Sequence, residues 1–381
     1  MGESDVDETG VNALVAPLRE RLSRALRPRG AAFGQGGFDP SRPDDRTRVY
    51  LTVDTECAEE RNLGGRVQPP LGYDLRVWGR FANRDEELGV PLIMSELEAY
   101  GMRGTFYTEA IGAHHFGKPG LSEVCQQILE RGHDVQLHVH PVQRDARLEQ
   151  GRARVSDNIS AYSLAEQTAL LREGIDLLTE AGVPRDSIRS YRAGNFGASN
   201  LTWRAMAGAG LTLSSNYNPC YFDLHCAMRS DKALAGLFPT EVDGVWELPI
   251  TNFRQPNGGH RHLQVMAVSL AEMVHCLRAC RARGIRHVTF VTHSFEYFHI
   301  DSISARRAHK NSINIARLRG LLEFVCAHDD EFVMETVGEL ARRLPQQVPD
   351  VREYPAEPRA LHWMRLVEQG VKRVSAHVPL P

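Results

Sequence analysis

The chain has 381 residues, a length that allows two or three small domains or one large α/β barrel with extensions. Its residues are 42% apolar and 24% charged, close to the globular average, which excludes full-length disorder and the collagen-like and coiled-coil classes. Lysine and arginine number 45 against 48 aspartates and glutamates, a net charge of −3. This balance carries no electrostatic footprint for nucleic acid or for an anionic membrane.

The N-terminus and the cysteines predict a cytoplasmic protein. No apolar run reaches the roughly 18 residues that a transmembrane helix requires. Residues 1–8 are acidic, where a secretory signal would be basic and then apolar. The seven cysteines are odd in number and scattered, which favours free thiols over a disulfide framework.

Composition divides the chain into three segments. Residues 1–46 are expected to form a largely flexible N-terminal extension, with apolar residues at roughly helical spacing from Val11 to Leu26 and a Gly-, Pro- and Arg-rich linker after them. Residues 47–344 are expected to form the folded unit. Residues 345–381 form a C-terminal tail, in which one amphipathic helix is predicted from Ala360 to Val374.

Strand and helix patterns alternate from residue 47 onward. β-Branched and aromatic runs predict strands at 48–54, 104–108, 133–138, 187–191, 211–215, 245–250, 287–293 and 332–335. Apolar periodicity and end signals predict helices at 91–100, 121–131, 163–181, 200–209, 269–283 and 313–327. A long loop is expected between 57 and 90. This alternation predicts a parallel sheet with crossover helices, as a (β/α) barrel or an open doubly wound sheet.

Polar residues stand at or just after the ends of five predicted strands. They are Asp54 and Glu56, His138 and His140, Arg192 and Asn195, Glu247, and His293 and Glu296. In α/β folds of this kind, function sits where strands end and loops begin. We therefore expect these five groups to converge on one site.

The first two groups have the residue types of a divalent metal site. Asp54 and Glu56 are two residues apart, so on a strand both point to one face, and His138 and His140 share that spacing. Two imidazoles and one carboxylate form a common open metal site, and the spare carboxylate can take a proton from water. Each signal alone also has an ordinary structural interpretation, as hydrogen-bonded core histidines or a solvated acidic turn. Five of them in order, each at a strand end, favour a site.

The order of these groups resembles the five successive motifs of the NodB-homology polysaccharide deacetylases, carbohydrate esterase family four. The strings are Thr52-Val-Asp-Thr-Glu56, Gly132-His-Asp-Val-Gln-Leu-His-Val-His140, Tyr191-Arg-Ala-Gly-Asn195, Glu247-Leu-Pro and Thr292-His-Ser, and the resemblance spans roughly residues 47–340. It implies a distorted (β/α) barrel with N- and C-terminal extensions, a zinc-type metal held by one carboxylate and two histidines, and hydrolysis of N-acetyl or O-acetyl groups on sugars.

The resemblance also implies the metal ligands. Glu56 stands where many members have an aspartate ligand, and His138 matches the first histidine ligand. The family's second histidine normally lies four residues further on, which here is Val142. His140 is the nearby substitute, so the expected set is Glu56, His138 and His140. The expected metal is Zn²⁺, with Co²⁺, Ni²⁺ or Mn²⁺ as alternatives.

The catalytic roles follow from the same resemblance. Asp54 resembles the catalytic base, and Arg192 resembles the arginine that orients it. His293 matches the general acid that protonates the leaving amine. Glu247, in the fourth motif, is expected to hydrogen-bond His293. The implied reaction is metal-assisted amide hydrolysis.

Four further residues are expected to bind substrate. Glu109 and Asn195 follow strand ends, Trp78 lies in the long loop where a ring could form an aromatic wall for a sugar, and Glu296 follows His293.

The predicted function is removal of an N-acetyl or similar N-acyl group from an amino sugar or glycosylated small molecule inside the cell. Nucleic acid and a membrane span are not expected, and the oligomeric state stays open. Two alternatives also stay open. One is a catalytically inactive sugar-binding barrel, and the other is a non-haem Fe(II) oxygenase, which uses the same two histidines and one carboxylate.

Overall fold

The computed structural model describes residues 44–63, 66–145 and 156–375. Its centre is a sheet in the order β12-β1-β4-β5-β6-β7-β9-β8, with β15 beside the start of β1. The pairs are parallel except β8 with β9. The strands are β1 (Thr47–Thr55), β4 (Thr105–Glu109), β5 (Asp134–Val139), β6 (Ser190–Ala193), β7 (Leu213–Ser214), β8 (Phe238–Pro239), β9 (Trp246–Glu247), β12 (His287–His293) and β15 (Phe332–Met334).

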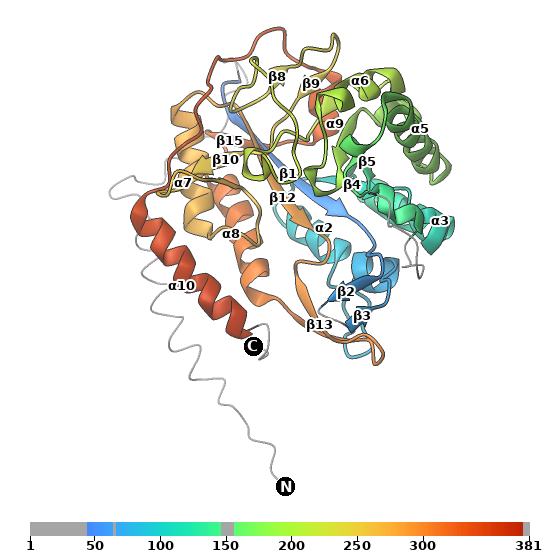
Figure 1. Cartoon of the computed structure of the whole chain (residues 1–381). Coiled ribbons are helices and arrows are strands. Elements are labelled where there is room, and N and C mark those ends of the chain that lie inside the picture. Colours follow the sequence, from blue (N-terminus) through green and yellow to red (C-terminus); the bar gives the residue numbers. More distant parts are fainter. Residues whose placement is uncertain (1–43, 64–65, 146–155, 376–381) are drawn as a thin grey trace.

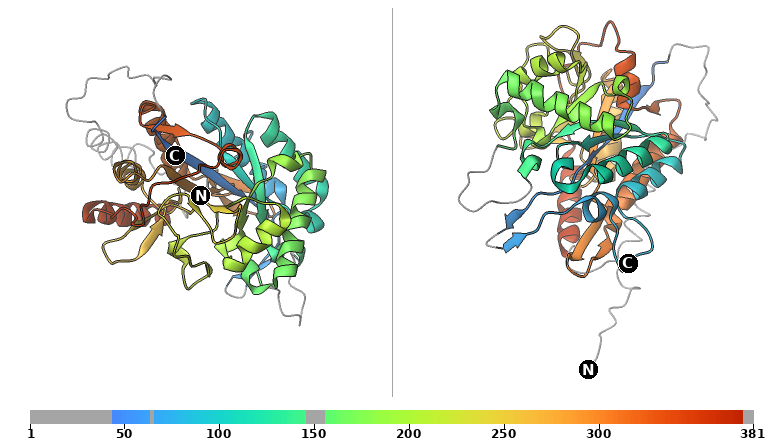
Figure 2. Two further views of the ribbon diagram at one scale, coloured as in Figure 1. Left: turned by 90° about the horizontal axis from the view of Figure 1, so that it is seen from above. Right: turned by 90° about the vertical axis from the view of Figure 1, so that its right-hand side faces the viewer.

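Helices link the parallel strands and surround the sheet. In Figure 1 the green and teal helices lie beside β4 and β5, and the orange helices lie on the other side of β1. The turned views in Figure 2 show the strands in the middle and helices around them. The helices are α2 (Val90–Glu98), α3 (Ala113–Phe116), α4 (Lys118–Glu130), α5 (Leu164–Glu180), α6 (Asn200–Ala209), α7 (Leu270–Ala282), α8 (Ser312–Ala327), α9 (Val337–Arg342) and α10 (Arg359–Ser375).

The sheet curls into a barrel that one irregular segment helps to close. Leu263 donates its backbone N–H to the carbonyl of Thr251 at 2.8 Å and accepts from Val291 of β12 at 2.9 Å. An isolated parallel bridge joins Gln264 to Val291. The gap between β9 and β12 is thus spanned by individual backbone hydrogen bonds and one isolated β-bridge, and not by a regular β-ladder. The distorted (β/α) barrel expected from the sequence is confirmed.

Helix α9 packs at the amino ends of the strands. Its first residues donate backbone N–H groups to side chains there, Val337 to Thr105 Oγ1 and Gly338 to Asp134 Oδ2, both at 2.8 Å. The apolar cluster beside it combines Leu340 of α9 with side chains in or next to the strands, namely Tyr50, Tyr107, Leu213, Leu237 and Leu248. Apolar packing therefore fills this end, and the polar strand-end residues are left at the carboxyl edge.

The predicted elements agree with the structure to within a few residues at their ends. Strand β1 is buried along almost its whole length, as expected for a central parallel strand. Helices α5 and α7 begin with the predicted capping boxes, Ser163 with Glu166 and Ser269 with Glu272. The predicted helix at Val11 to Leu26 lies outside the described residues.

Several short elements were not expected. The segment predicted as one loop between 57 and 90 contains a hairpin and a π-helical turn. Two further hairpins lie between β9 and α8. Strand β8 and the short helices α3 and α9 were also not expected. The other additional elements include β2 (Arg61–Leu63), β3 (Arg66–Gln68), the π-helix η1 (Tyr73–Trp78), β10 (Asn252–Arg254), β11 (His260–His262), β13 (Phe298–Ser302) and β14 (Arg307–Lys310).

Helix α10 confirms the predicted C-terminal helix and docks through polar side chains. Arg365, 1% exposed, donates to Glu272 of α7 at 2.7 Å, and Glu368 accepts from Arg317 of α8 at 2.9 Å. Its apolar Trp363 and Val367 are 67% and 68% exposed. Of the described helices, none is both long and apolar enough to cross a bilayer.

Candidate active site

Strand register brings the predicted site residues to one edge of the sheet. Asp54 of β1 lies opposite His293 of β12, and Glu109 of β4 lies opposite His138 of β5. His138 in turn lies opposite Arg192 of β6. Because these strands are parallel, their carboxyl ends share one edge. The expected convergence is therefore present in the structure.

Glu56, His138 and His140 form a compact buried cluster, which we call the ligand cluster. Their ligand atoms lie within 4.8 Å of one another. Glu56 Oε2 is 3.3 Å from His138 Nε2 and 2.7 Å from His140 Nε2. Val142 is also buried, and its side chain offers no ligand atom. The structure therefore places the imidazole of His140, two residues after His138, in the cluster, and Val142, four residues after His138, supplies no ligand.

The donor chemistry of this cluster fits a divalent metal. His138 Nδ1 lies 2.9 Å from the backbone carbonyl of Arg192, which can only accept, so Nδ1 carries the proton. In the neutral ring, Nε2 then presents its lone pair to Glu56 Oε2. Nε2 and Oε2 are then two hydrogen-bond acceptors that face each other. This arrangement is favourable only when a second ring proton or a cation lies between them. Two imidazoles and one carboxylate are a ligand set that Zn²⁺ accepts with a position left open.

Electrostatics inside the ligand cluster favour charged groups. Burial raises the pKa of Glu56, but the charge of His140 and hydrogen bonds from both histidines outweigh burial and hold the pKa well below its usual value. Burial lowers the pKa of His140, but the carboxylates of Asp157 and Glu56 outweigh it and raise the pKa well above its usual value. Binding a metal at His140 Nε2 would therefore release a proton.

Asp54 lies beside the ligand cluster and is held by an arginine. Arg192 Nη1 donates to Asp54 Oδ1 at 2.6 Å, and the guanidinium also donates to Ser215 Oγ at 3.0 Å and packs over the ring of Tyr107. Asp54 Oδ2 lies 3.9 Å from His293 Nε2, which is beyond hydrogen-bond distance. The carboxylate and the imidazole can therefore both face a third group placed between them.

Glu296 is the carboxylate that fixes His293. Its Oε1 is 2.7 Å from His293 Nδ1, and it also accepts from Gln264 Nε2 at 2.6 Å and Thr292 Oγ1 at 2.7 Å. Burial lowers the pKa of His293, but this hydrogen bond and the charges of Glu296, Asp54 and Glu56 raise it to about 9. The arrangement keeps His293 protonated at neutral pH. Glu296 was expected to bind substrate, and its contacts instead orient an imidazole.

The expected hydrogen bond from Glu247 to His293 is wrong. Glu247 is fully buried, and its Oε2 accepts from Trp203 Nε1 at 2.8 Å. Its Oε1 accepts the backbone N–H groups of Asn216 and Tyr217 at 2.7 and 2.9 Å. With both oxygens bonded, Glu247 holds the backbone after β7, and this positions the barrel wall.

Trp78 and Glu109 do not present themselves to a ligand. Trp78 is 2% exposed and belongs to the main apolar core, so it cannot form the expected sugar-binding wall. Glu109 accepts the backbone N–H groups of Ile111 and Gly112 at 2.9 and 2.8 Å. Burial raises its pKa to about 7. Glu109 therefore stabilises the turn into α3.

Asn195 is exposed, and it binds a protein side chain. Its Nδ2 donates to Asp157 Oδ2 at 2.6 Å, and the same oxygen is 2.8 Å from His140 Nδ1. Asp157 and Gln264 are the site residues that sequence reasoning missed. Asp157 lies in a loop and Gln264 in the bridging segment, so neither stands at a predicted strand end. The motifs carry no local signal for either contact.

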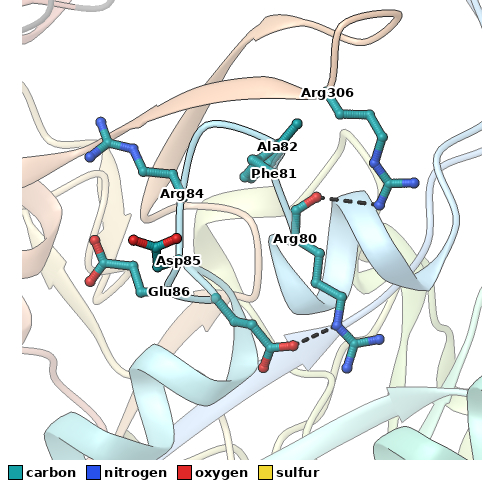
Figure 3. Close-up of a pocket in the computed structure, with 8 residues that line it drawn as sticks. Arg80, Phe81, Ala82, Arg84, Asp85, Glu86 and Arg306 are labelled. Carbon is teal, nitrogen blue, oxygen red and sulfur yellow. Dashed lines mark hydrogen bonds and ion pairs between the residues drawn. The ribbon is translucent and has the colours of Figure 1, made fainter.

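A separate cavity of about 360 Å³ is lined by residues outside this site (Figure 3). It is lined by the loop after η1, residues 80–82 and 84–87, and by Arg306. Arg80 Nε pairs with Glu87 Oε1 at 2.5 Å, and Arg306 donates to the carbonyl of Arg80 at 3.4 Å. Arg80 thus has a charged partner within the lining, and the lining contains none of the ligand-cluster residues.

The chain matches no family model and no curated protein. Among solved structures it is similar to a Mycobacterium smegmatis protein assigned by its name to the polysaccharide deacetylases, at 18% identity and a TM-score of 0.48 over 84% of this chain and 96% of that one. A 4-α-glucanotransferase from Thermococcus litoralis is similar at 12% identity and 0.46, over 80% of this chain and 42% of that one. A family 4 carbohydrate esterase from Streptomyces lividans, in complex with acetate, is similar at 9% and 0.39, over 81% and 98%. The family that the sequence motifs resemble is thus represented among the structures to which this chain is similar.

Proposed function

We propose that the chain is a divergent NodB-homology deacetylase, a metal-dependent hydrolase that removes an N-acetyl or similar N-acyl group from an amino sugar or a glycosylated small molecule. One observation carries this proposal. The ligand cluster, with its ligand atoms within 4.8 Å of one another, lies beside a carboxylate and an imidazole that are not hydrogen-bonded to each other. A metal position, a base and an acid are the parts that amide hydrolysis needs.

Each part has a role in cleaving the C–N bond. A divalent cation held by Glu56, His138 and His140 would supply Lewis-acid polarisation of the acyl carbonyl and lower the pKa of a water molecule. Asp54 takes the proton of the attacking water at Oδ2, since Arg192 occupies Oδ1. The protonated Nε2 of His293 donates to the departing nitrogen. Water thus adds its hydroxyl to the acyl carbon, and the amine leaves protonated.

The supporting observations differ for each part of the proposal. The amide chemistry rests on the geometry of Asp54 and His293 beside the ligand cluster. Zn²⁺ is the proposed metal because the site offers two imidazoles and one carboxylate. The sugar class rests on the motif resemblance. The parallel sheet with crossover helices does not favour an oxygenase, since such oxygenases normally have an all-β fold.

The test is release of acetate from N-acetylglucosamine, its short β-1,4 oligomers and its nucleoside-diphosphate conjugate. We expect turnover by the Zn²⁺-loaded wild type, and Asp54→Asn should lower kcat by about 10²–10⁴-fold because a general base contributes that much. The variant should still bind one metal. Asp176→Asn, an exposed carboxylate on α5 that pairs with Arg185, is the matched control and should keep full activity. Full activity in Asp54→Asn would show that Asp54 is not the base.

A further inference from the structure

The two imidazoles of the ligand cluster are oriented in different ways. His138 belongs to β5, and its Nδ1 meets the backbone carbonyl of Arg192 on the adjacent strand. His140 lies just beyond the end of β5, and its Nδ1 meets the side chain of Asp157 at 2.8 Å. Sheet geometry therefore fixes one ring, and the other depends on a loop residue.

Asp157 is itself held in place. Asn195 Nδ2 donates to Asp157 Oδ2 at 2.6 Å, so one carboxylate oxygen joins the amide to the His140 ring. The side chain of Asp157 is 25% exposed and that of His140 is 10% exposed. A carboxylate that is mostly screened from water keeps a stronger hydrogen bond to an imidazole than an exposed one would.

The backbone after β6 closes on the other side of the His140 ring. A Cβ atom added to Gly194 would lie 2.3 Å from His140 Nδ1 and 2.4 Å from Cε1, so only glycine allows the ring this position. Asn195 and Phe196 follow with φ of 54° and 55°, a left-handed conformation that costs free energy in residues other than glycine. This turn brings the Asn195 amide to Asp157 and the Gly194 backbone against the ring.

The consequence for His140 is a defined tautomer. A carboxylate accepts, so Nδ1 carries a proton, and Nε2 is the atom directed at Glu56 Oε2 at 2.7 Å. A metal-binding histidine commonly donates its other ring N–H to a carboxylate in this way, which fixes the ring and raises its basicity.

We propose that Asp157, held by Asn195, is a positioning residue that fixes the tautomer and ring orientation of His140 as the second imidazole ligand. This inference rests on the proposed function, because it requires that the ligand cluster binds a metal. It explains how His140 can be the second imidazole ligand although it lies only two residues after His138. At that position β5 has ended, and no neighbouring strand holds the ring.

The experiment is Co²⁺ binding to the metal-free protein, measured by competition with a chromophoric chelator and by the visible absorption of bound Co²⁺. Asp157→Ala should weaken Co²⁺ binding by about 10–100-fold and change the Co²⁺ spectrum, since outer partners of metal ligands have effects of that size. Asp157→Asn should recover part of the affinity, because the amide oxygen still accepts from Nδ1. Asn195→Ala should also weaken Co²⁺ binding, but by less than Asp157→Ala does.

The matched control is Glu173→Ala. Glu173 also lies 2.8 Å from a histidine nitrogen, Nε2 of His114, outside the ligand cluster. The Glu173→Ala variant should bind Co²⁺ as the wild type does. Wild-type affinity and spectrum in folded Asp157→Ala would overturn the positioning role while leaving the metal site intact. If Asp157→Ala does not fold, wild-type values in both Asp157→Asn and Asn195→Ala would overturn it. Failure of the wild type to bind Co²⁺ would overturn this inference and the proposed metal site together.

Discussion

Two of the buried clusters of charged and ionisable side chains among the described residues differ in what lies at the centre. In the ligand cluster, three ligand atoms from Glu56, His138 and His140 face one another. In the second, which we call the Arg365 cluster, the guanidinium of Arg365 lies among Glu272, Glu357 and His362. Both are buried within the described structure, so burial alone does not identify a functional site.

The Arg365 cluster contains its own cation. Arg365 Nε donates to Glu272 Oε1 at 2.7 Å, and His362 Nδ1 is 3.1 Å from Glu357 Oε2. Burial raises the pKa of Glu272 to about 7, and a hydrogen bond with Glu357 adds to the rise. Arg365 thus supplies the positive charge between the two acids, and its contacts attach α10 to α7.

At the ligand cluster, an arginine contacts the edge and does not occupy the centre. Arg76 Nη2 is 3.7 Å from Glu56 Oε1, whereas the inner oxygen Oε2 faces the two imidazoles. Outer partners, the carbonyl of Arg192 and the carboxylate of Asp157, fix the rings. A cluster that holds a guanidinium at its centre stabilises a contact between helices. A cluster whose ligand atoms converge could hold a cation taken from solution.

The largest effect expected in this comparison is on the docking of α10. Arg365→Met leaves the buried carboxylates without their cation, and breaking a buried pair in this way costs about 3–5 kcal/mol. Native-state hydrogen exchange of the α10 amides should show that loss, with metal binding unchanged. The exposed Arg185, paired with Asp176, is the control, and Arg185→Met should change stability by about 0–1 kcal/mol. Wild-type protection of α10 in Arg365→Met would refute a structural role for the Arg365 cluster.

A smaller effect concerns pH. The folded pKa of Glu272 is near 7 and its ordinary value is 4.5, so its contribution to stability is fully present below about pH 4.5 and is lost as pH rises through 7. Glu357→Gln removes the carboxyl group that adds to this rise, so the free energy of unfolding should fall less between pH 5 and 7.5. Urea unfolding of both proteins at these two pH values measures the difference. Equal falls in wild type and variant would show that Glu357 does not raise the pKa of Glu272.

The residue pattern predicted most of the barrel because β1, β4, β5 and β12 are buried strands. Each can be recognised from the apolar and β-branched residues of its own short segment. The convergence of Asp54, His138, Arg192 and His293 also followed, since parallel strands end at one edge. The hydrogen-bonding partners of these residues could not be predicted from the sequence. Asp157 lies 17 residues from His140 in a loop, and its contact depends on the left-handed turn at Asn195.

Two predicted roles failed for the same physical reason. Trp78 was predicted from loop composition, but the π-helical turn η1 directs it into the core. Glu247 stands at a strand end, but Trp203 and two backbone amides take up its oxygens. Whether a side chain faces the site, the core or the barrel wall depends on tertiary partners that no local pattern specifies.

The most direct test of the account is the zinc content of the purified protein after reconstitution and dialysis. The wild type should hold about one Zn²⁺ per chain, and both His138→Ala and Glu56→Gln should lose it, since each removes one ligand. His309→Ala, which alters a buried histidine paired with Asp301 outside the ligand cluster, should retain it. A wild type that holds no zinc, or ligand variants that keep it, would contradict the account.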